Sequence, residues 1–302
     1  MDSDVSYTLL LYLITSFIFS MTILLISGSL LSFFIGWDLL GFTSLFLIFW
    51  YRSRAALSSG LLTALRNRVG DVALLCLFGL RADFGSSFVG FVYILLLVSF
   101  TKSAQFPFRA WLPAAISAPT PVSALVHSST LVTAGVFLLL RHLSTFPTLL
   151  TYTGITTIFL GGYTALLSCD LKKIVAFSTL SQLGLLMLSF CCGSKSAVLL
   201  HLLCHGPFKA LLFLCVGTSM HSSYGSQEAR YAIHLGSARG LTTVLGSISL
   251  FALSGLPFLA GGISKHTLFA LISGSSTSFM IFVSFLLGVV LTGAYCAKFL
   301  AL

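Results

Sequence analysis

Ionisable side chains that interrupt long apolar stretches are the most informative feature of this sequence. Only 8% of the 302 residues are charged, whereas 57% are hydrophobic. A charged side chain at mid-membrane depth costs at least about 2.5–3.5 kcal/mol, and such residues commonly serve ion or proton transfer. We take seven residues as candidates for a proton path: Asp38, Lys102, His127, His201, His205, Lys209 and Lys265.

His201, His205 and Lys209 follow one another at intervals of four residues, so they share one face of a helix with rows about 6 Å apart. An imidazole can accept a proton on one nitrogen while it donates from the other, and it titrates near physiological pH. We interpret the row as a proton relay that ends in a chargeable lysine. Histidines that only pack, or a metal site that lacks a glutamate and a third ligand, remain alternatives.

Asp38 follows Trp37 in an apolar run that contains no base. We therefore expect its counter-charge to come from another helix, and Lys102 is the candidate. A carboxylic acid kept neutral by burial, or one near the headgroups, is the alternative. Lys265 lies beside a second interrupted segment, as Lys102 lies beside the first. His127 has hydroxyl-bearing neighbours that can anchor water, although a purely structural role is equally compatible with its spacing.

Apolar runs of about 20 residues predict the helices that must position these side chains. The fold class is therefore an all-α polytopic membrane protein. The runs lie at 7–26, 29–50, 62–80, 87–107, 120–141, 148–168, 173–192, 197–220, 240–258, 263–275 and 277–299. They make ten membrane elements if 240–275 is one broken element.

Two segments are interrupted by proline and glycine, at 102–113 and at 255–262. Such breaks survive at membrane depth only where protein or water covers them. Each break lies in the fourth element of a five-element half. We therefore predict two inverted five-helix repeats, each with one broken helix, over residues 1–143 and 144–302.

The basic residues predict the orientation, because short matrix or cytoplasmic loops collect Lys and Arg. Nine fall on one face of the predicted topology and three on the other: Arg52, Arg54, Arg66, Arg68, Lys172, Lys173, Arg230, Arg239 and Lys298 against Arg81, Arg141 and Lys195. Met1 is therefore expected on the matrix or cytoplasmic side. The bases are too scattered for a nucleic-acid surface, so we expect lipid, and no nucleic acid, as a partner. The first apolar run lacks a cleavage site and is expected to be a permanent span.

Cofactor motifs are missing from the sequence. It has seven cysteines but no Cys-x-x-Cys pair, and no glycine-rich nucleotide loop. We expect no cofactor, no metal and no redox chemistry in this chain.

Several motifs together resemble the antiporter-like chain 5 subunits of respiratory complex I. They are Trp37-Asp38, Asn-Arg-Val-Gly-Asp at 67–71, Lys-Ser-Ala-Gln-Phe-Pro at 102–107, Trp-Leu-Pro at 111–113, Pro-Thr-Pro-Val-Ser-Ala-Leu-Val-His at 119–127, Leu-Lys-Lys-Ile at 171–174, Ser-Thr-Leu-Ser-Gln-Leu-Gly at 178–184 and Phe-Lys-Ala-Leu-Leu-Phe at 208–213. The resemblance implies that Asp38 pairs with Lys102. It also implies that His127, His201, His205 and Lys209 form a central relay, and that Lys265 is the exit-side lysine.

The implied function is proton translocation in NADH:ubiquinone oxidoreductase, driven by redox chemistry in other subunits. A sodium/proton antiporter subunit, or a structural membrane subunit with decayed transport, is the alternative. Expected partners are other membrane-arm subunits and lipids. A further expected partner is a companion chain of about three helices, since the resemblance starts at the family's fourth helix. The expected location is the mitochondrial inner membrane, or alternatively a bacterial one.

Two departures from the family pattern stand out. His266 replaces the usual aspartate after the exit-side lysine, so a stabilising counter-charge is missing there. Pro207 lies within the relay row, where it removes one amide donor and is expected to disturb the helix.

Overall fold

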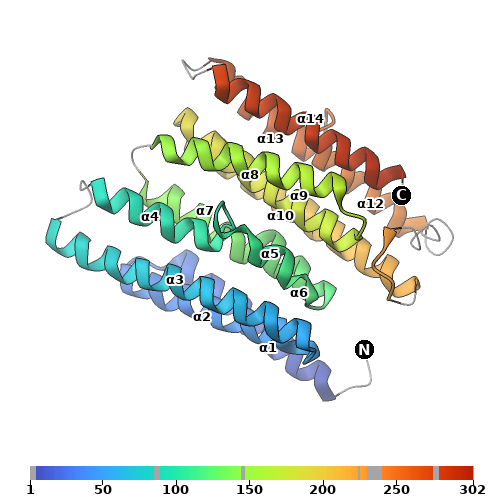
Figure 1. Ribbon diagram of the computed structural model, residues 1–302, viewed down its shortest axis with the longest axis horizontal. Coiled ribbons are helices and arrows are strands. Elements are labelled where there is room, and N and C mark those ends of the chain that lie inside the picture. The colour runs from blue at the N-terminus through green and yellow to red at the C-terminus, as the bar shows by residue number, and fades with distance from the viewer. Residues whose placement is uncertain are drawn as a thin grey trace.

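The computed structural model describes residues 5–84, 89–143, 147–223, 225–229, 240–274 and 279–301. Long helices run roughly side by side and are stacked in chain order from α1–α3 to α12–α14 (Figure 1). Within the described residues the only extended pairing is an isolated bridge between Asp170 and Glu228. The expectation of an all-α polytopic membrane protein is confirmed.

The helices correspond closely to the apolar runs of the sequence. In the first part of the chain they are α1 (Val5–Ile26), α2 (Leu30–Ile48), α3 (Arg54–Phe84), α4 (Val89–Lys102), α5 (Trp111–Ala114), α6 (Thr120–Leu125) and α7 (Leu131–His142), with the short helices η1 (Phe49–Tyr51), η2 (Phe108–Ala110), η3 (Ala115–Ser117) and η4 (Val126–Thr130). In the second part they are α8 (Thr148–Leu167), α9 (Leu171–Ser189), η5 (Phe190–Cys192), α10 (Lys195–Ser222), α12 (Gly240–Ser254), α13 (Ala260–Gly274) and α14 (Phe279–Ala301).

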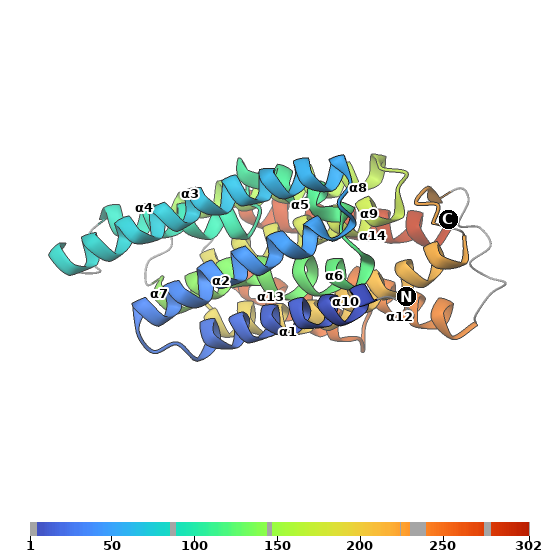
Figure 2. The same ribbon diagram turned by 90° about the horizontal axis from the view of Figure 1, so that it is seen from below.

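Several of these helices are suited to a membrane. Among the described residues, six segments are long and apolar enough to cross a bilayer by length and composition. They are Tyr7–Ile26, Leu31–Tyr51, Thr120–His142, Leu171–Ser189, Lys195–Ser222 and Phe279–Ala301. The start of α1 and the end of α14 lie at the same end of the molecule in both views (Figures 1 and 2).

The third helix is longer than the sequence suggested. It begins at Arg54 rather than near residue 62, because a helix needs no unbroken apolar run where polar faces are covered by neighbours. Arg66 and Arg68 therefore lie inside α3, and assigning them to a loop on the basic face was wrong. Two other bases in that assignment, Arg230 and Arg239, lie outside the described residues.

Both predicted interruptions are present. Helix α4 ends at Lys102 and is followed by short turns up to α5, and α12 ends at Ser254 before α13 begins at Ala260. Pro107 has no amide donor, and Gly255 adopts a φ of 91°, which a side chain would strain. The inverted relation between residues 1–143 and 144–302 stays a prediction. Pro207, by contrast, does not end α10, which continues through it.

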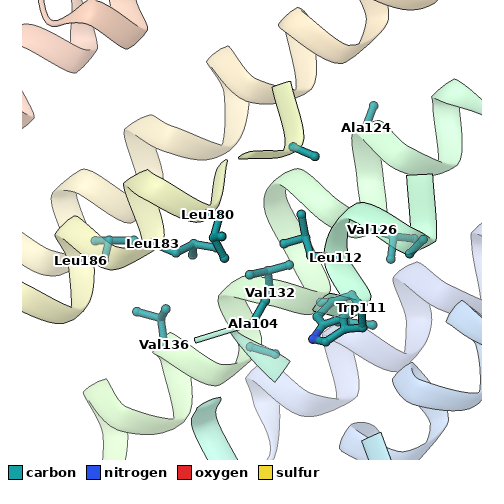
Figure 3. Close-up of a cluster of buried hydrophobic side chains, with 14 of the residues drawn as sticks. Ala104, Trp111, Leu112, Ala124, Val126, Val132, Val136, Leu180, Leu183 and Leu186 are labelled. Atoms are coloured by element: carbon teal, nitrogen blue, oxygen red, sulfur yellow. The ribbon is translucent and has the colours of Figure 1, made fainter. Parts of the chain in front are cut away.

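The centre of the molecule is packed around α9, whose membrane-spanning window is 89% buried. Side chains of α9, such as Leu180 and Leu183, face Leu112 and Val132 of the preceding helices (Figure 3). Glycine lets α8 approach α9 closely, since a Cβ on Gly184 would lie 2.6 Å from Thr157 Oγ1. Polar side chains in α9 and α10 are therefore held in a well-packed interior.

Candidate functional site

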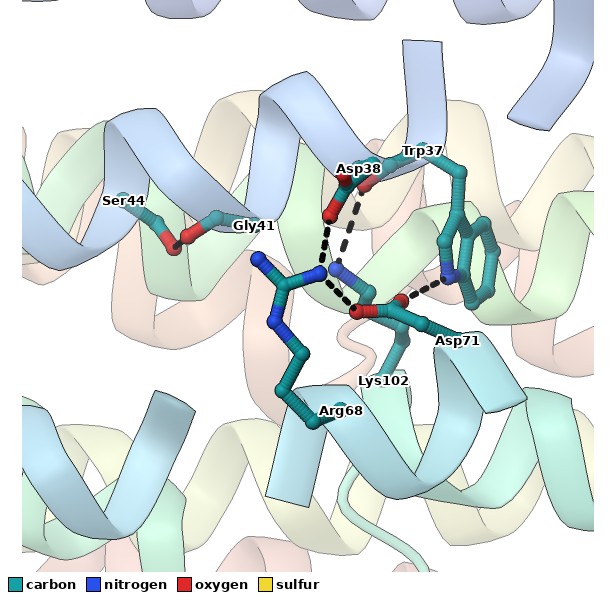
Figure 4. A network of polar contacts seen from close by, with 7 residues as sticks. All are labelled: Trp37, Asp38, Gly41, Ser44, Arg68, Asp71 and Lys102. Carbon is teal, nitrogen blue, oxygen red and sulfur yellow. Dashed lines mark hydrogen bonds and ion pairs between the residues drawn. The ribbon is translucent and has the colours of Figure 1, made fainter. Parts of the chain in front are cut away.

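The first polar cluster joins α2, α3 and α4. Lys102 is 1% exposed, and its ammonium lies 5.1 Å from the ring centroid of Trp37 and donates to the Trp37 carbonyl at 3.4 Å. Asp71 accepts a hydrogen bond from Trp37 Nε1 at 3.1 Å and forms an ion pair with Arg68 at 3.4 Å. Arg68 also binds Asp38 at 2.8 Å (Figure 4). Two bases and two acids thus balance one another in this cluster.

Asp38 pairs with a base on another helix, as expected, but that base is Arg68 rather than Lys102. The ion-pair partner of Asp38 is Arg68, and within the described residues no Asp38–Lys102 pair is close enough to count as a salt bridge. Both carboxylates still act on Lys102 electrostatically, Asp71 more strongly than Asp38. Arg68 and Asp71 were missed as site residues because they are three residues apart on α3, where they read as an ordinary solvated pair.

Two glycines make room for this cluster. A Cβ on Gly41 would lie 3.0 Å from Lys102 Nζ, and one on Gly70 would lie 2.3 Å from Thr101 Oγ1. Helices α2 and α3 therefore approach α4 closely at the level of its terminal lysine. The positions of these small residues, rather than the charges alone, fix where the ammonium lies.

His127 lies in η4, a single π-helical turn between α6 and α7. Such turns are rare and occur frequently at functional sites. The imidazole is 0% exposed, and neither ring nitrogen has a hydrogen-bond partner. The Ala115 carbonyl lies close enough to interact, but not in the geometry of a hydrogen bond. The neighbouring hydroxyls of Ser128 and Thr130 donate to the carbonyls of Ala124 and Leu125 instead, so the buried, unpaired imidazole is suited to contact with water.

The predicted row on α10 is present and wholly buried. His201, His205 and Lys209 are each 0% exposed, and the two imidazole centroids lie 6.3 Å apart. Lys209 Nζ donates to Ser178 Oγ of α9 at 2.5 Å. His201 Nδ1 and Ser264 Oγ of α13 share a hydrogen bond at 2.9 Å. The row therefore spans the interior between α9 and α13.

Most of the ring nitrogens along this row lack a protein partner. They are His201 Nε2, His205 Nδ1 and His205 Nε2. A buried polar atom without a partner costs about 1–3 kcal/mol, so bridging water is the usual remedy. The 6.3 Å between the two imidazoles is too long for a direct hydrogen bond and suits one bridging water.

Lys265 lies at the second helix break and is 6% exposed. Its ammonium donates to the carbonyls of Leu253 and Ser254 at 2.7 and 3.3 Å, and to Thr292 Oγ1 at 3.0 Å. The two carbonyls belong to the last turn of α12, where the helix dipole favours a positive charge. The lysine thereby satisfies backbone acceptors that the break would otherwise leave unpaired.

The sequence-predicted residues fall into separate groups. Ser264 connects the row to the second break, because it binds His201 and precedes Lys265 in α13. Helix η4, which carries His127, packs against α10. No hydrogen bond or ion pair among the described residues joins Lys102 to the α10 row. Ser178, Ser264 and Thr292 were missed from sequence because a serine or threonine in a membrane helix usually bonds only its own backbone.

Comparisons with known proteins show which family has a similar sequence. Residues 27–292 match the family described as "NADH:quinone oxidoreductase/Mrp antiporter, TM". The chain is 40% identical to NADH-ubiquinone oxidoreductase chain 5 of Locusta migratoria over 98% of this chain and 55% of that one. It is 41% identical to the chain of the same name from Anopheles arabiensis, over 90% of this chain and 76% of that one. The chain spans about half the length of most curated relatives that it matches.

Two solved structures have a similar fold. A chain of the Mrp complex from Dietzia sp. DQ12-45-1b superposes with a TM-score of 0.86 at 30% identity, over 95% of this chain and 35% of that one. A chain of the archaeal membrane-bound sulfane sulfur reductase superposes with a TM-score of 0.81 at 20% identity, over 97% of this chain and 65% of that one. The latter likeness concerns the fold alone. The resemblance seen in the motifs is confirmed, and the chain belongs to the NADH:quinone oxidoreductase/Mrp antiporter family of membrane proteins.

Proposed function

We propose that this chain translocates protons as a membrane subunit of an NADH:ubiquinone oxidoreductase, with the redox chemistry in other subunits. The observation that carries the proposal is a buried set of proton-exchanging side chains with unsatisfied ring nitrogens. Lys102, Lys209 and Lys265 are at most 6% exposed, and the imidazoles of His127, His201 and His205 are fully buried. Such groups are expensive in a membrane interior unless they serve transfer.

The contacts suggest an order of steps. A proton held by Lys209 passes through water to His205 and then to His201, which binds Ser264 beside Lys265. Each imidazole receives a proton on one nitrogen and releases one from the other, so it ends each step neutral. Lys265 takes the proton and later releases it outward. Rearrangement of the Asp38, Arg68, Asp71 and Lys102 cluster supplies the change in charge that drives the first step.

The names of the relatives support this enzyme and its location. They are NADH-ubiquinone oxidoreductase chain 5 of insects and other animals. The proposed location is accordingly the mitochondrial inner membrane, with Met1 on the matrix side. Arg66 and Arg68 lie midway along α3 rather than near a helix end, and without them the sequence count is seven bases against three, which supports the same orientation.

The first polar cluster supports a protein partner. Asp38 and Arg68 lie midway along α2 and α3, yet their side chains are 38% and 59% exposed on the surface of this chain. Lipid tails cannot solvate such a pair, so part of another membrane-arm subunit covers it in the assembled complex. A companion of about three helices is proposed to cover α1, whose spanning window is only 22% buried. Lipid at α1 in the purified assembly would leave the companion without support.

Substitution of Lys209 tests the proposed function. Lys209→Met keeps the length of the side chain but cannot hold a proton, so proton translocation per NADH oxidised should fall roughly tenfold or more. Lys195→Met is the matched control, since Lys195 is exposed at the start of the same helix. Unchanged translocation in Lys209→Met would favour the structural-subunit alternative.

A sodium/proton antiporter is the second candidate function, favoured by the likeness to the Mrp complex. The two functions differ in what appears on the far side of the membrane. Sealed vesicles that contain the assembled complex should acidify on NADH oxidation in sodium-free buffer if protons are pumped directly. Acidification that requires sodium and tracks sodium movement would favour the antiporter.

A further inference from the structure

A cavity of about 820 Å³ opens where η1, α6, α9 and α10 end or begin. Its lining includes the polar side chains of Ser53, Ser117, Thr120, Lys172 and His221. A water molecule occupies about 30 Å³ in the liquid, so the cavity has room for a connected water chain. None of these residues belongs to the proton path described above.

The cavity lies at the basic end of the molecule. Arg52 and Arg54 flank η1 and the start of α3, Lys172 and Lys173 open α9, and Lys298 closes α14. Lys298 donates to the Ser168 carbonyl at 2.7 Å, which ties the end of α14 to the end of α8. Under the proposed orientation this end faces the matrix, from which protons are taken up.

The rim of the cavity is held in place by backbone pairing. Leu171 donates to the Gln227 carbonyl at 3.1 Å, and Ala229 donates to the Cys169 carbonyl at 3.0 Å. On the opposite wall, a Cβ on Gly217 of α10 would lie 2.8 Å from Thr120 Oγ1. The opening is thus built from fixed elements that approach one another closely at glycine.

Lys172 is one of the residues that line this cavity. Its residue is 6% exposed, and its ammonium makes one long hydrogen bond, to the Ala118 carbonyl at 3.4 Å. An ammonium has three donors, so two remain for water in the cavity. Tyr51 and His221 are the other titratable side chains in the lining, and they belong to η1 and α10. No acidic side chain among the described residues lines the cavity, so none of them neutralises Lys172 there.

Helix α9 carries both Lys172 and a partner of the central row. Ser178 lies six residues after Lys172, a rise of about 9 Å, and accepts the hydrogen bond from Lys209. Ser178, Thr179 and Gln182 are all buried on α9. Six residues also turn the side chains of Lys172 and Ser178 to different faces of α9, so the proposed connection is a chain of at least two or three waters at ordinary hydrogen-bond spacing.

We propose that Lys172 is the proton-loading residue of a water-filled inlet at the basic end, and that it delivers protons along α9 to Lys209. A hydronium ion that enters the cavity from the matrix gives its proton to the Lys172 amine, which becomes an ammonium, and a water molecule is left behind. The ammonium releases that proton to the bridging waters, which pass a proton to the neutral amine of Lys209, and the Lys172 amine is restored. The inlet rests on the proposed function but adds a residue and an uptake side to it.

Adjacent lysines provide a matched pair for the test. Lys173 is next in sequence, but its side chain is 52% exposed and forms an ion pair with Asp170. In the assembled complex, Lys172→Met should lower proton translocation per NADH oxidised several-fold, whereas Lys173→Met should leave it unchanged. Lys172→Arg keeps the charge but cannot release a proton, so it should fail like Lys172→Met, while Lys172→His should restore part of the rate. Full activity in Lys172→Arg would overturn the inlet, because it would mean that only the positive charge of Lys172 is needed.

Water access is tested separately from transport. Thr120→Cys lies in the cavity lining and should react with a membrane-impermeant, charged thiol reagent added from the basic side only, as read by peptide mass spectrometry. Ser123→Cys, one turn deeper and fully buried, should not react. An unreactive Thr120→Cys would overturn the inlet. Because Lys209→Met tests translocation itself, loss in that variant with normal activity in Lys172→Met would reject only the inlet.

Discussion

The two broken helices each hold a buried lysine, but the surroundings of the two lysines differ. Lys102 lies among Asp71, Asp38 and Arg68, so its charge is balanced by other charges. Among the described residues Lys265 has no carboxylate as a hydrogen-bond partner, and it binds two backbone carbonyls and the Thr292 hydroxyl. The charged side chains around Lys102 can change its proton affinity when one of them moves or changes its charge. The carbonyl and hydroxyl dipoles around Lys265 are fixed by the backbone and by packing, so they act on its ammonium in a constant way.

The same comparison extends to the glycine beside each lysine. Gly41 leaves space at the Lys102 ammonium, and Gly255 leaves space at Lys265, where a Cβ would lie 2.9 Å from Cδ. Gly41 is inside a regular helix, whereas Gly255 adopts a positive φ at the break. Similar lysines are therefore placed by helix packing in one half and by backbone conformation in the other.

The largest expected contrast comes from removing each lysine. Lys102→Met leaves Asp71 buried without one of its balancing charges, a change that costs about 3–5 kcal/mol in buried pairs. Lys265→Met leaves carbonyls at a helix end, which costs about 1–3 kcal/mol. Both variants should lose proton translocation, but only Lys102→Met should also lower the amount of assembled subunit. Native gels and translocation assays measure the two effects, and equal assembly would show that charge balance around Lys102 contributes little.

The sequence was sufficient for the membrane helices and both breaks, because apolar length and proline or glycine act locally. It was also sufficient for the α10 row, since spacing alone puts His201, His205 and Lys209 on one face. It was insufficient for the partner of Asp38, because Arg68 is thirty residues away and helix rotation decides which base faces the acid. The acceptors of Lys265 were equally hidden, as two of them are backbone carbonyls exposed only by the break.

The second contrast lies within the charged cluster. Asp71 is 5% exposed and lies between Arg68, Trp37 and Lys102, whereas the only ion-pair partner of Asp38 among the described residues is Arg68. Asp71→Asn should therefore reduce translocation and assembly more than Asp38→Asn, since an exposed ion pair contributes about 0–1 kcal/mol. Translocation per NADH and the thermal inactivation of the complex test this order. A larger effect from Asp38→Asn would mean that the covering subunit buries the Asp38 pair more deeply than this chain buries Asp71.

The smallest contrast separates the two glycines. Gly255→Ala must place a side chain at a φ of 91°, where an L-residue is strained by about 1–2 kcal/mol, and must also displace the Lys265 side chain. Gly41→Ala brings a methyl group to 3.0 Å from Lys102 Nζ. That atom is the far end of a flexible chain and can move by a few tenths of an ångström.

Gly255→Ala should therefore slow translocation at unchanged assembly, because it moves Lys265 away from the carbonyls of α12 while the helices themselves stay packed. Gly41→Ala should have a weaker effect, measured in the same vesicles. If Gly41→Ala is the more harmful of the two, the position of Lys102 is held more tightly by its neighbouring charges than Lys265 is by the break. Packing rather than backbone conformation would then be the more sensitive of the two ways to place a lysine.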